Sequence, residues 1–98
     1  MKRIIAKKTL REFWDKHADS EQYLKTWYET AKNSEWTSPS DIKKTYINAS
    51  ILKDSRVVFN IKGNFYRLIV KFNFDRKWAF IRFIGTHAEY DKINADTI

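Results

Sequence analysis

The feature that most constrains the fold is a change in the spacing of apolar residues near position 50. Before this point apolar residues recur every three or four positions, the spacing that gives a helix one apolar face. After it, three runs rich in Val, Ile, Phe, Tyr and Trp alternate with polar residues, which is typical of strands. The sequence therefore predicts an α+β fold in which a helical first half covers a sheet built by the second half.

The first half predicts a helical hairpin and a short third helix. Residues 10–18 have apolar positions at helical spacing, and residues 9–12 have the form of a capping box. Residues 20–33 repeat the helical spacing behind polar N-cap side chains. A serine followed by proline begins the third helix, which covers 38–46 in one or two turns. The short links place the three helices next to one another.

The second half predicts antiparallel strands at 56–62, 65–74 and 78–84. Gly63-Asn64 suits a two-residue type II′ turn, which fixes the register of the first two strands. One face of this pair is then almost wholly apolar: Val57, Phe59, Ile61, Tyr66, Leu68, Val70 and Phe72. The helices must cover that face. With a possible first strand at 3–6, we expect a three- to four-stranded antiparallel sheet, followed by a short C-terminal helix within 86–94.

The register of the last strand depends on the loop after Asp75. A three-residue loop places Arg82 on the apolar face, whereas a two-residue loop at Arg76-Lys77 places it on the opposite face. We expect the shorter loop, because an unpaired arginine in a core costs several kcal/mol. This register puts three residues toward the core (Ala79, Ile81 and Phe83) and three on the other face (Phe80, Arg82 and Ile84).

The face opposite the helices gathers polar and cationic side chains among aromatic ones: Arg56, Asn60, Lys62, Arg67, Lys71, Asn73 and Arg82. The whole chain has 19 Lys and Arg against 12 Asp and Glu, a formal charge of +7. Solvated faces of antiparallel sheets are ordinarily polar, but they mix the two signs of charge. Because this face has almost no carboxylate, and aromatic rings can stack on unpaired bases, it favours single-stranded RNA as the partner.

The composition excludes several classes of protein. Without cysteine there is no disulfide, no Cys-based zinc site and no thiol nucleophile. No apolar run approaches the length of about 20 residues that a membrane span needs, and none near the start suits a secretory signal. We therefore expect residues 1–98 to form one domain in the cytoplasm, with no membrane partner, no metal and no cofactor.

His87 is the candidate for proton transfer. It follows the last strand and would share one side of a short helix with Tyr90, over the rim of the cationic face. Imidazole titrates near neutral pH, a phenol can donate a proton, and guanidinium groups pair with phosphate oxygens. A metal-free ribonuclease needs these groups, although a lone histidine after a strand is also a common structural cap. His17, near a helix end, is interpreted as a boundary residue without chemistry.

Two motifs carry a resemblance to a known family. N-x-K-G-N-x-Y-R-L at 60–68 and T-H-x-E-Y-D at 86–91, behind a helical hairpin and a short third helix, resemble the HigB branch of the RelE-like toxins. The resemblance implies the toxin of a bacterial type II toxin–antitoxin pair. It implies an endoribonuclease that cuts mRNA, usually on translating ribosomes, and so inhibits translation. It also implies neutralisation by a helix-turn-helix antitoxin of the HigA kind, which represses the operon.

The resemblance also implies roles for particular residues. The strand arginine of the family corresponds to Arg67, and its lysine before the turn corresponds to Lys62. The family motif at the end of the sheet corresponds to His87 and Tyr90. Better-known RelE toxins have arginine where His87 stands, which leaves the general base open between His87 and Lys62. We expect Arg67 and Arg82 to neutralise the scissile phosphate, His87 to act as acid or base, and Tyr90 to orient a base or phosphate. Further contacts to RNA are expected from Arg56, Asn60, Lys71 and Asn73.

Two other classes of function fit the same cationic face. The chain could be a non-catalytic RNA-binding module, in which alanine substitutions weaken a salt-dependent interaction and no cleavage occurs. It could also be an interaction domain whose cations meet an acidic protein. The resemblance favours the ribonuclease over both.

Overall fold

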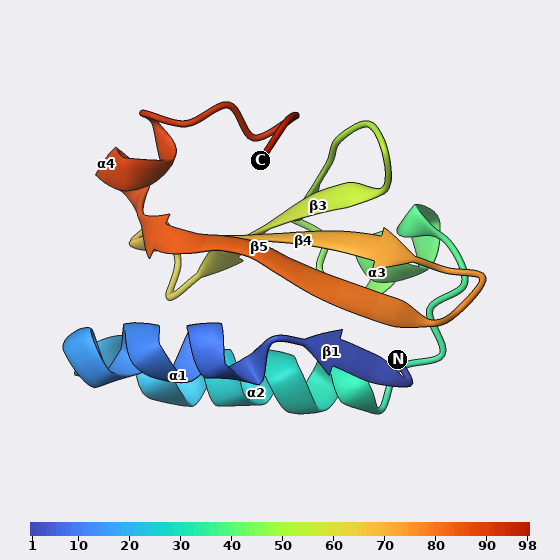
Figure 1. Cartoon of the computed structure of the whole chain (residues 1–98), viewed down its shortest axis with the longest axis horizontal. Helices are drawn as coiled ribbons and strands as arrows, with labels where there is room; N and C mark the ends of the chain where they lie inside the picture. The colour runs from blue at the N-terminus through green and yellow to red at the C-terminus, as the bar shows by residue number, and fades with distance from the viewer.

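The computed structural model describes residues 1–98 and confirms an α+β fold. Its elements, in chain order, are β1 (Arg3–Ile5), α1 (Lys7–Lys16), α2 (Glu21–Lys32), α3 (Pro39–Thr45), β2 (Ser50–Ile51), β3 (Arg56–Ile61), β4 (Tyr66–Asn73), β5 (Trp78–Thr86) and α4 (His87–Tyr90). The strands form one sheet in the order β1-β5-β4-β3-β2. In Figure 1, α1 and α2 lie along one side of the sheet, which we call the core face, and α4 lies on the other, the outer face.

The predicted helical hairpin and short third helix are present, with one difference at the start. α1 begins at Lys7, so Thr9 lies inside the helix and the predicted capping box does not form. The cap is Ala6, which makes no side-chain hydrogen bond. Leu10 and Trp14 are the buried residues of α1, at the spacing that defines its apolar side. A single 3-10 turn then leads directly into α2, which makes the hairpin tight.

The first hairpin of the sheet has the predicted register. Asn60 pairs with Arg67, Val58 with Ile69, and Arg56 with Lys71. The Phe65 N–H donates to the Lys62 carbonyl at 3.2 Å across the turn, and Gly63 has φ +63°, a conformation that favours glycine.

The sheet is larger than predicted, with five strands. β1 joins β5 in parallel, so the sheet is mixed and not wholly antiparallel. The two-residue β2 pairs with β3 and was not expected, because so short a segment has no periodicity to recognise.

A single apolar core lies between the helices and the core face of the sheet. It contains 17 buried residues, and Phe59 is among the largest that are fully buried. The Phe59 ring meets Trp27 of α2 edge-on at 5.4 Å between ring centres, and it meets Tyr46, after α3, at 5.2 Å. Phe59 thus joins the sheet to two of the covering helical segments.

The predicted two-residue loop between β4 and β5 is wrong. Asn73 pairs with Trp78, so residues 74–77 form a four-residue connection. The Asn73 Oδ1 accepts the Arg76 N–H at 3.1 Å, and this side-chain contact stabilises the wider turn. The pairs that follow, Phe72 with Ala79 and Val70 with Ile81, still put Ala79 and Ile81 on the core face as predicted.

Beyond Ile81 a β-bulge reverses the predicted faces. Arg82 has no partner in the register, so Phe83 pairs with Ile69 and belongs to the outer face. Ile84 pairs with Leu68 and packs against the core. An extra residue in one strand shifts all later side chains to the opposite face, and no glycine marks it in the sequence. Arg82 itself remains exposed, as predicted.

The C-terminal part of the chain lies on the outer face. The predicted capping box forms: the Glu89 N–H donates to Thr86 Oγ1 at 3.1 Å, and the Thr86 N–H donates to Glu89 Oε1 at 2.8 Å. α4 is shorter than predicted, and a coil then runs back over the sheet (Figure 1). None of the helices in the structure has the length and apolar character to cross a membrane.

Candidate nucleic-acid interface

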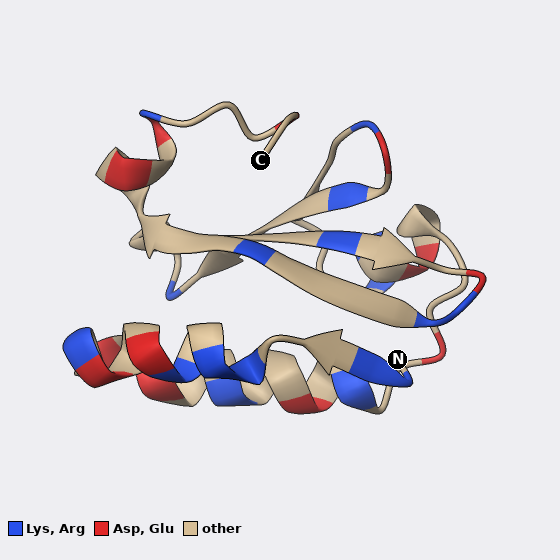
Figure 2. Cartoon of the chain, viewed as in Figure 1, with Lys and Arg blue, Asp and Glu red and all other residues tan.

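The strands of the sheet carry positive charge only. They contain no Asp or Glu, and their cations are Arg3, Arg56, Arg67, Lys71 and Arg82. Figure 2 shows blue and no red along the strands, whereas α1 and α2 carry both colours. Acidic residues near the outer face lie in loops and in α4, at its rim. The outer face therefore offers a positively charged floor to an anionic partner.

Three of the predicted site residues lie together at the end of the sheet where β5 leads into α4. The His87 N–H donates to the Phe65 carbonyl at 3.0 Å, which fixes the start of α4 beside the first hairpin. The Arg67 guanidinium lies 5.8 Å from the centre of the Tyr90 ring, within the range of a cation–π contact. Arg67 also donates to the Asn64 carbonyl at 3.2 Å. We call Arg67, His87 and Tyr90 the terminal cluster.

His87 is exposed and has one carboxylate partner. Its Nδ1 lies 3.1 Å from Oδ2 of Asp91, one helical turn further on. Nδ1 is therefore the nitrogen that faces a carboxylate, and Nε2 is the nitrogen that faces no charged partner. Sequence reasoning gave Asp91 no role, although its position four residues after His87 would have indicated the contact.

Lys62 does not join the terminal cluster. Its Nζ lies 2.8 Å from Oδ2 of Asp19, in the link between α1 and α2. The prediction that Lys62 shares the outer face with Arg67 is therefore wrong, because the side chain is directed toward the helical layer. Lys62 has φ +52° at the end of the strand, which departs from the strand alternation that the prediction assumed.

Asp19 has two side-chain partners, and these contacts shift the pKa values of Asp19 and of Tyr66. The Tyr66 hydroxyl donates to Oδ1 of Asp19 at 2.5 Å, opposite the contact with Lys62. Hydrogen bonds from Lys62 and then Tyr66 lower the pKa of the Asp19 carboxyl. The hydrogen bond to that carboxylate raises the pKa of Tyr66 to about 12. His17 stacks on Phe13 at 4.3 Å between ring centres, a contact that fits the structural role expected for it.

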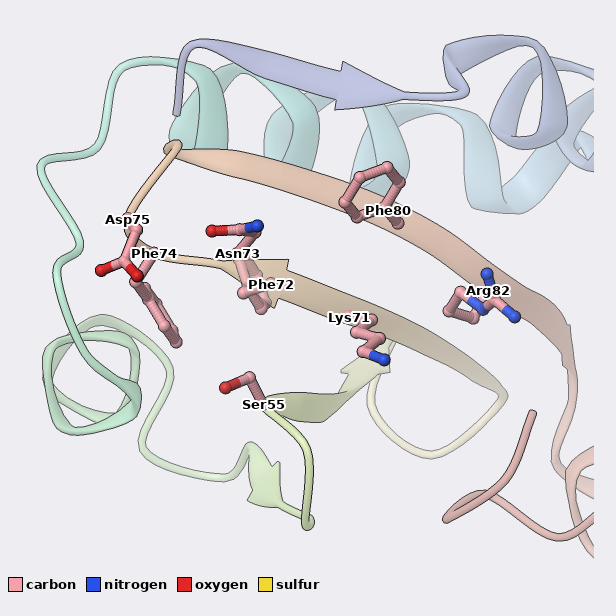
Figure 3. Close-up of a pocket in the computed structure, with 8 residues that line it drawn as sticks. All are labelled: Ser55, Lys71, Phe72, Asn73, Phe74, Asp75, Phe80 and Arg82. Carbon is pink, nitrogen blue, oxygen red and sulfur yellow. The ribbon is translucent and has the colours of Figure 1, made fainter.

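The remaining predicted residues lie elsewhere on the outer face. Lys71, Asn73 and Arg82 line a hollow of about 540 Å³, shown in Figure 3. Arg56 is only 7% exposed, and its Nε donates to the Ile98 main-chain oxygen at 3.0 Å, so the C-terminal coil covers it. Asn60 is exposed beside its partner Arg67. Asn60 thus lies beside the terminal cluster, whereas Lys71 and Asn73 lie toward the other end of β4 and Arg82 lies in the middle of β5.

The structure contains no group of three or more His, Asp or Glu side chains that could hold a metal ion.

Known proteins resemble this chain over most of its length. Residues 20–93 match the HigB toxin family, described as the RelE-like toxic component of a toxin–antitoxin system. A protein named mRNA interferase HigB from Escherichia coli O6:H1 strain CFT073 is 29% identical over 92 residues, which cover 92% of this chain and 89% of the relative. The mRNA interferase toxin HigB of Escherichia coli K12 is 27% identical over 94 residues, covering 94% and 90%. With its α+β fold and the match over residues 20–93, the chain belongs to the HigB family of RelE-like toxins.

Proposed function

We propose that this protein is an endoribonuclease that cuts mRNA on the translating ribosome and so inhibits translation. The observation that carries the proposal is the terminal cluster, which puts a guanidinium, an imidazole and a phenol at one end of a positively charged sheet face. The relatives named mRNA interferase support the same activity. The antitoxin that the family implies is proposed to be a helix-turn-helix protein of the HigA kind.

The proposed reaction is attack by a ribose 2′-oxygen on the adjacent phosphorus. The 2′-O–P bond forms and the P–O5′ bond breaks, which leaves a 2′,3′-cyclic phosphate and a 5′-hydroxyl. The reaction needs a base for the 2′-OH proton, positive charge beside the phosphate, and an acid for the departing 5′-oxygen. No group outside the chain and the RNA is required to balance these steps.

His87 is the proposed proton-transfer group. Its free Nε2 can accept the 2′-OH proton when the ring is neutral, or donate to the 5′-oxygen when the ring is protonated. Asp91 lies beside Nδ1 and would orient the ring so that Nε2 is available to the RNA. Lys62 is the weaker candidate for the base, because its ammonium is engaged by Asp19.

Arg67 is the proposed phosphate ligand. A guanidinium can pair with two phosphate oxygens and stabilise the charge that gathers on them during attack. The ring of Tyr90 beside it would orient the phosphate or a neighbouring base. Arg82 lies at the hollow, away from the terminal cluster, so its proposed role is to bind the RNA strand and not the scissile phosphate.

The two histidines of the chain provide a matched test. His87→Gln and His17→Gln each remove one imidazole, and only the first should lower mRNA cleavage, by about 10²- to 10⁴-fold. The variants are expressed in bacteria, growth is followed, and new mRNA 5′ ends are mapped by primer extension. Parental cleavage by His87→Gln overturns the site. A wild-type protein that binds RNA with strong salt dependence and creates no new 5′ ends would instead be the non-catalytic RNA-binding module.

A further inference from the structure

The hollow on the outer face lies far from the terminal cluster and has no part in the proposed cleavage step. It is lined by the end of β4, the start of β5, the loop between them and Ser55 before β3 (Figure 3). Phe80 lies near the start of β5 and His87 follows its last residue, seven positions later, so at ~3.3 Å per residue these two residues are roughly 20 Å apart. At about 540 Å³ the hollow falls within the size range of small-ligand sites.

A cation and an aromatic ring stand side by side in this hollow. Lys71 and Phe80 are directly paired across β4 and β5, so their side chains are neighbours on the outer face. Phe80 is half-buried, which leaves part of its ring open to the hollow. No carboxylate forms an ion pair with Lys71 or with Arg82. Lys71 is therefore free to meet an anion, and Arg82 keeps the part of its guanidinium that does not contact Ile98.

Arg82 of the hollow shares one oxygen acceptor with Arg56, which is not among the lining residues. The Nε of Arg56 and the Nε of Arg82 donate to the main-chain oxygen of Ile98, at 3.0 and 3.4 Å. Arg56 is also 3.5 Å from Asp54, so it is partly neutralised, whereas Arg82 is not. Convergent guanidinium groups of this kind suit a phosphate oxygen.

The hollow also has polar groups that can meet the edge of a base. Asn73 accepts the Arg76 N–H through Oδ1, which orients the amide and leaves its NH₂ free to donate. Ser55 adds a hydroxyl, and Asp75 adds a carboxylate that accepts hydrogen bonds. Unpaired bases are held in proteins by a ring for stacking and by such donors and acceptors for the base edge.

We propose that the hollow binds one nucleotide of the RNA, several positions away from the cut, with its base on Phe80 and its phosphate at Lys71 and Arg82. The proposal deepens the proposed function and rests on it, because the RNA is the one cut at the terminal cluster. A protein that binds RNA at both ends of the sheet contacts a strand longer than the dinucleotide that it cleaves. Loss of the hollow should raise KM and leave kcat unchanged.

Binding without cleavage tests the hollow directly. Fluorescence anisotropy measures the affinity for a 2′-O-methyl oligonucleotide, which has no free 2′-OH to attack. Phe80→Leu keeps the apolar volume and removes the aromatic face, and Lys71→Gln removes the charge. Each should weaken binding about tenfold, with circular dichroism checking that the variants are folded. Lys8→Gln is the matched control, because Lys8 is exposed on α1 in the opposite layer and should change affinity less than twofold.

The outcomes separate the hollow from the cleavage site. Unchanged affinity of Phe80→Leu overturns the nucleotide site, whether or not the protein cuts RNA. If the variants lose affinity as expected but the wild-type protein cuts no RNA, only the proposed function is overturned. Polyglutamate is tested as a competitor. If it binds as tightly as the oligonucleotide, and if Phe80→Leu weakens its binding to the same extent, the hollow binds an acidic protein and the proposal is overturned.

Photochemical cross-linking gives a second, positional test. An oligonucleotide with 5-bromouridine at successive positions is irradiated with the protein and digested with trypsin. Cleavage after Lys77 and Arg82 releases residues 78–82, which contain Phe80. We expect cross-links on this peptide from one or two positions of the oligonucleotide, and their loss in Phe80→Leu. Cross-links confined to peptides of α1 and α2 would contradict the site.

Discussion

The two faces of the sheet use the same three long strands for different purposes. On the core face, alternate residues enter a cluster of 17 buried side chains beneath α1 and α2. On the outer face, the buried apolar residues outside that cluster are only Val58 and Ile69. The other outer positions are cations, amides and half-exposed rings. One set of strands therefore supplies stability through one half of its residues and a binding surface through the other half.

The largest effect on stability is expected on the core face, at Phe59. Phe59→Ala removes a ring that is 1% exposed and contacts both Trp27 and Tyr46. Because the surrounding core cannot fill the space, the free energy of unfolding should fall by about 3–5 kcal/mol. Urea denaturation followed by tryptophan fluorescence measures the loss. A loss below about 1 kcal/mol would show that Phe59 is not central to the core.

The opposite result is expected on the outer face, at Arg67. Arg67→Ala should lower mRNA cleavage about 10²- to 10³-fold, as expected when a group that stabilises developing charge is lost. The free energy of unfolding should change by no more than about 0.5 kcal/mol, since the side chain supports no buried contact. Arg11→Ala is the control, because Arg11 is exposed on α1 and the change also removes one positive charge. A variant that loses activity only because it unfolds would break the distinction between the faces.

Adjacent valines in β3 compare the two faces within one strand. Val57 is fully buried toward the core, and Val58 is 3% exposed on the outer face. Val57→Ala and Val58→Ala delete the same atoms, and each should cost about 1–3 kcal/mol of unfolding free energy. The Val57 change should be the more costly, because Val57 belongs to the core cluster and Val58 lies outside it. Equal losses by urea denaturation would show that the two faces of β3 are packed equally rigidly.

The predictable parts of the fold were those with a strong local signal. Gly63-Asn64 between two alternating runs predicts the register of β3 and β4, and the structure confirms it. Ser38 and Pro39 likewise predict the start of α3. The β4–β5 connection was mispredicted because Asn73 closes the turn through its own side chain, a contact that periodicity does not contain. The bulge at Arg82 has no sequence marker at all.

The candidate site was likewise predictable where the signal was local, and not where it depended on contacts between distant segments. Strand alternation and helical spacing were enough to bring Arg67 and Tyr90 near His87, because both signals are local. Lys62 was misplaced because its partner, Asp19, is 43 residues away in the chain. The hollow beside Phe80 is a product of strand pairing and of the wider loop, so no motif could have indicated it. Contacts between distant segments are what the sequence pattern alone does not contain.

The smallest effect is expected where the core face meets the polar rim, at Tyr66. The Tyr66 hydroxyl donates to Asp19, and this bond raises the pKa of Tyr66 to about 12, against an ordinary value of 10.0. The native state therefore keeps the phenol proton that the unfolded chain releases near pH 10. The stabilisation is complete below pH 10 and is lost as the pH rises toward 12. In Tyr66→Phe this pH-dependent contribution is absent.

Absorbance at 295 nm, which counts ionised phenols, should show one of the five tyrosines titrating near pH 12. That step should disappear in Tyr66→Phe and persist in Tyr23→Phe, whose ring is 49% exposed. The urea midpoint of Tyr66→Phe should lie below that of the wild type at pH 8, and the difference should shrink between pH 10 and 12. A difference that stays constant over this range would mean that Asp19 does not hold the Tyr66 proton. The ion pair between Lys62 and Asp19 would then be the polar contact that joins the helical hairpin to the first hairpin of the sheet.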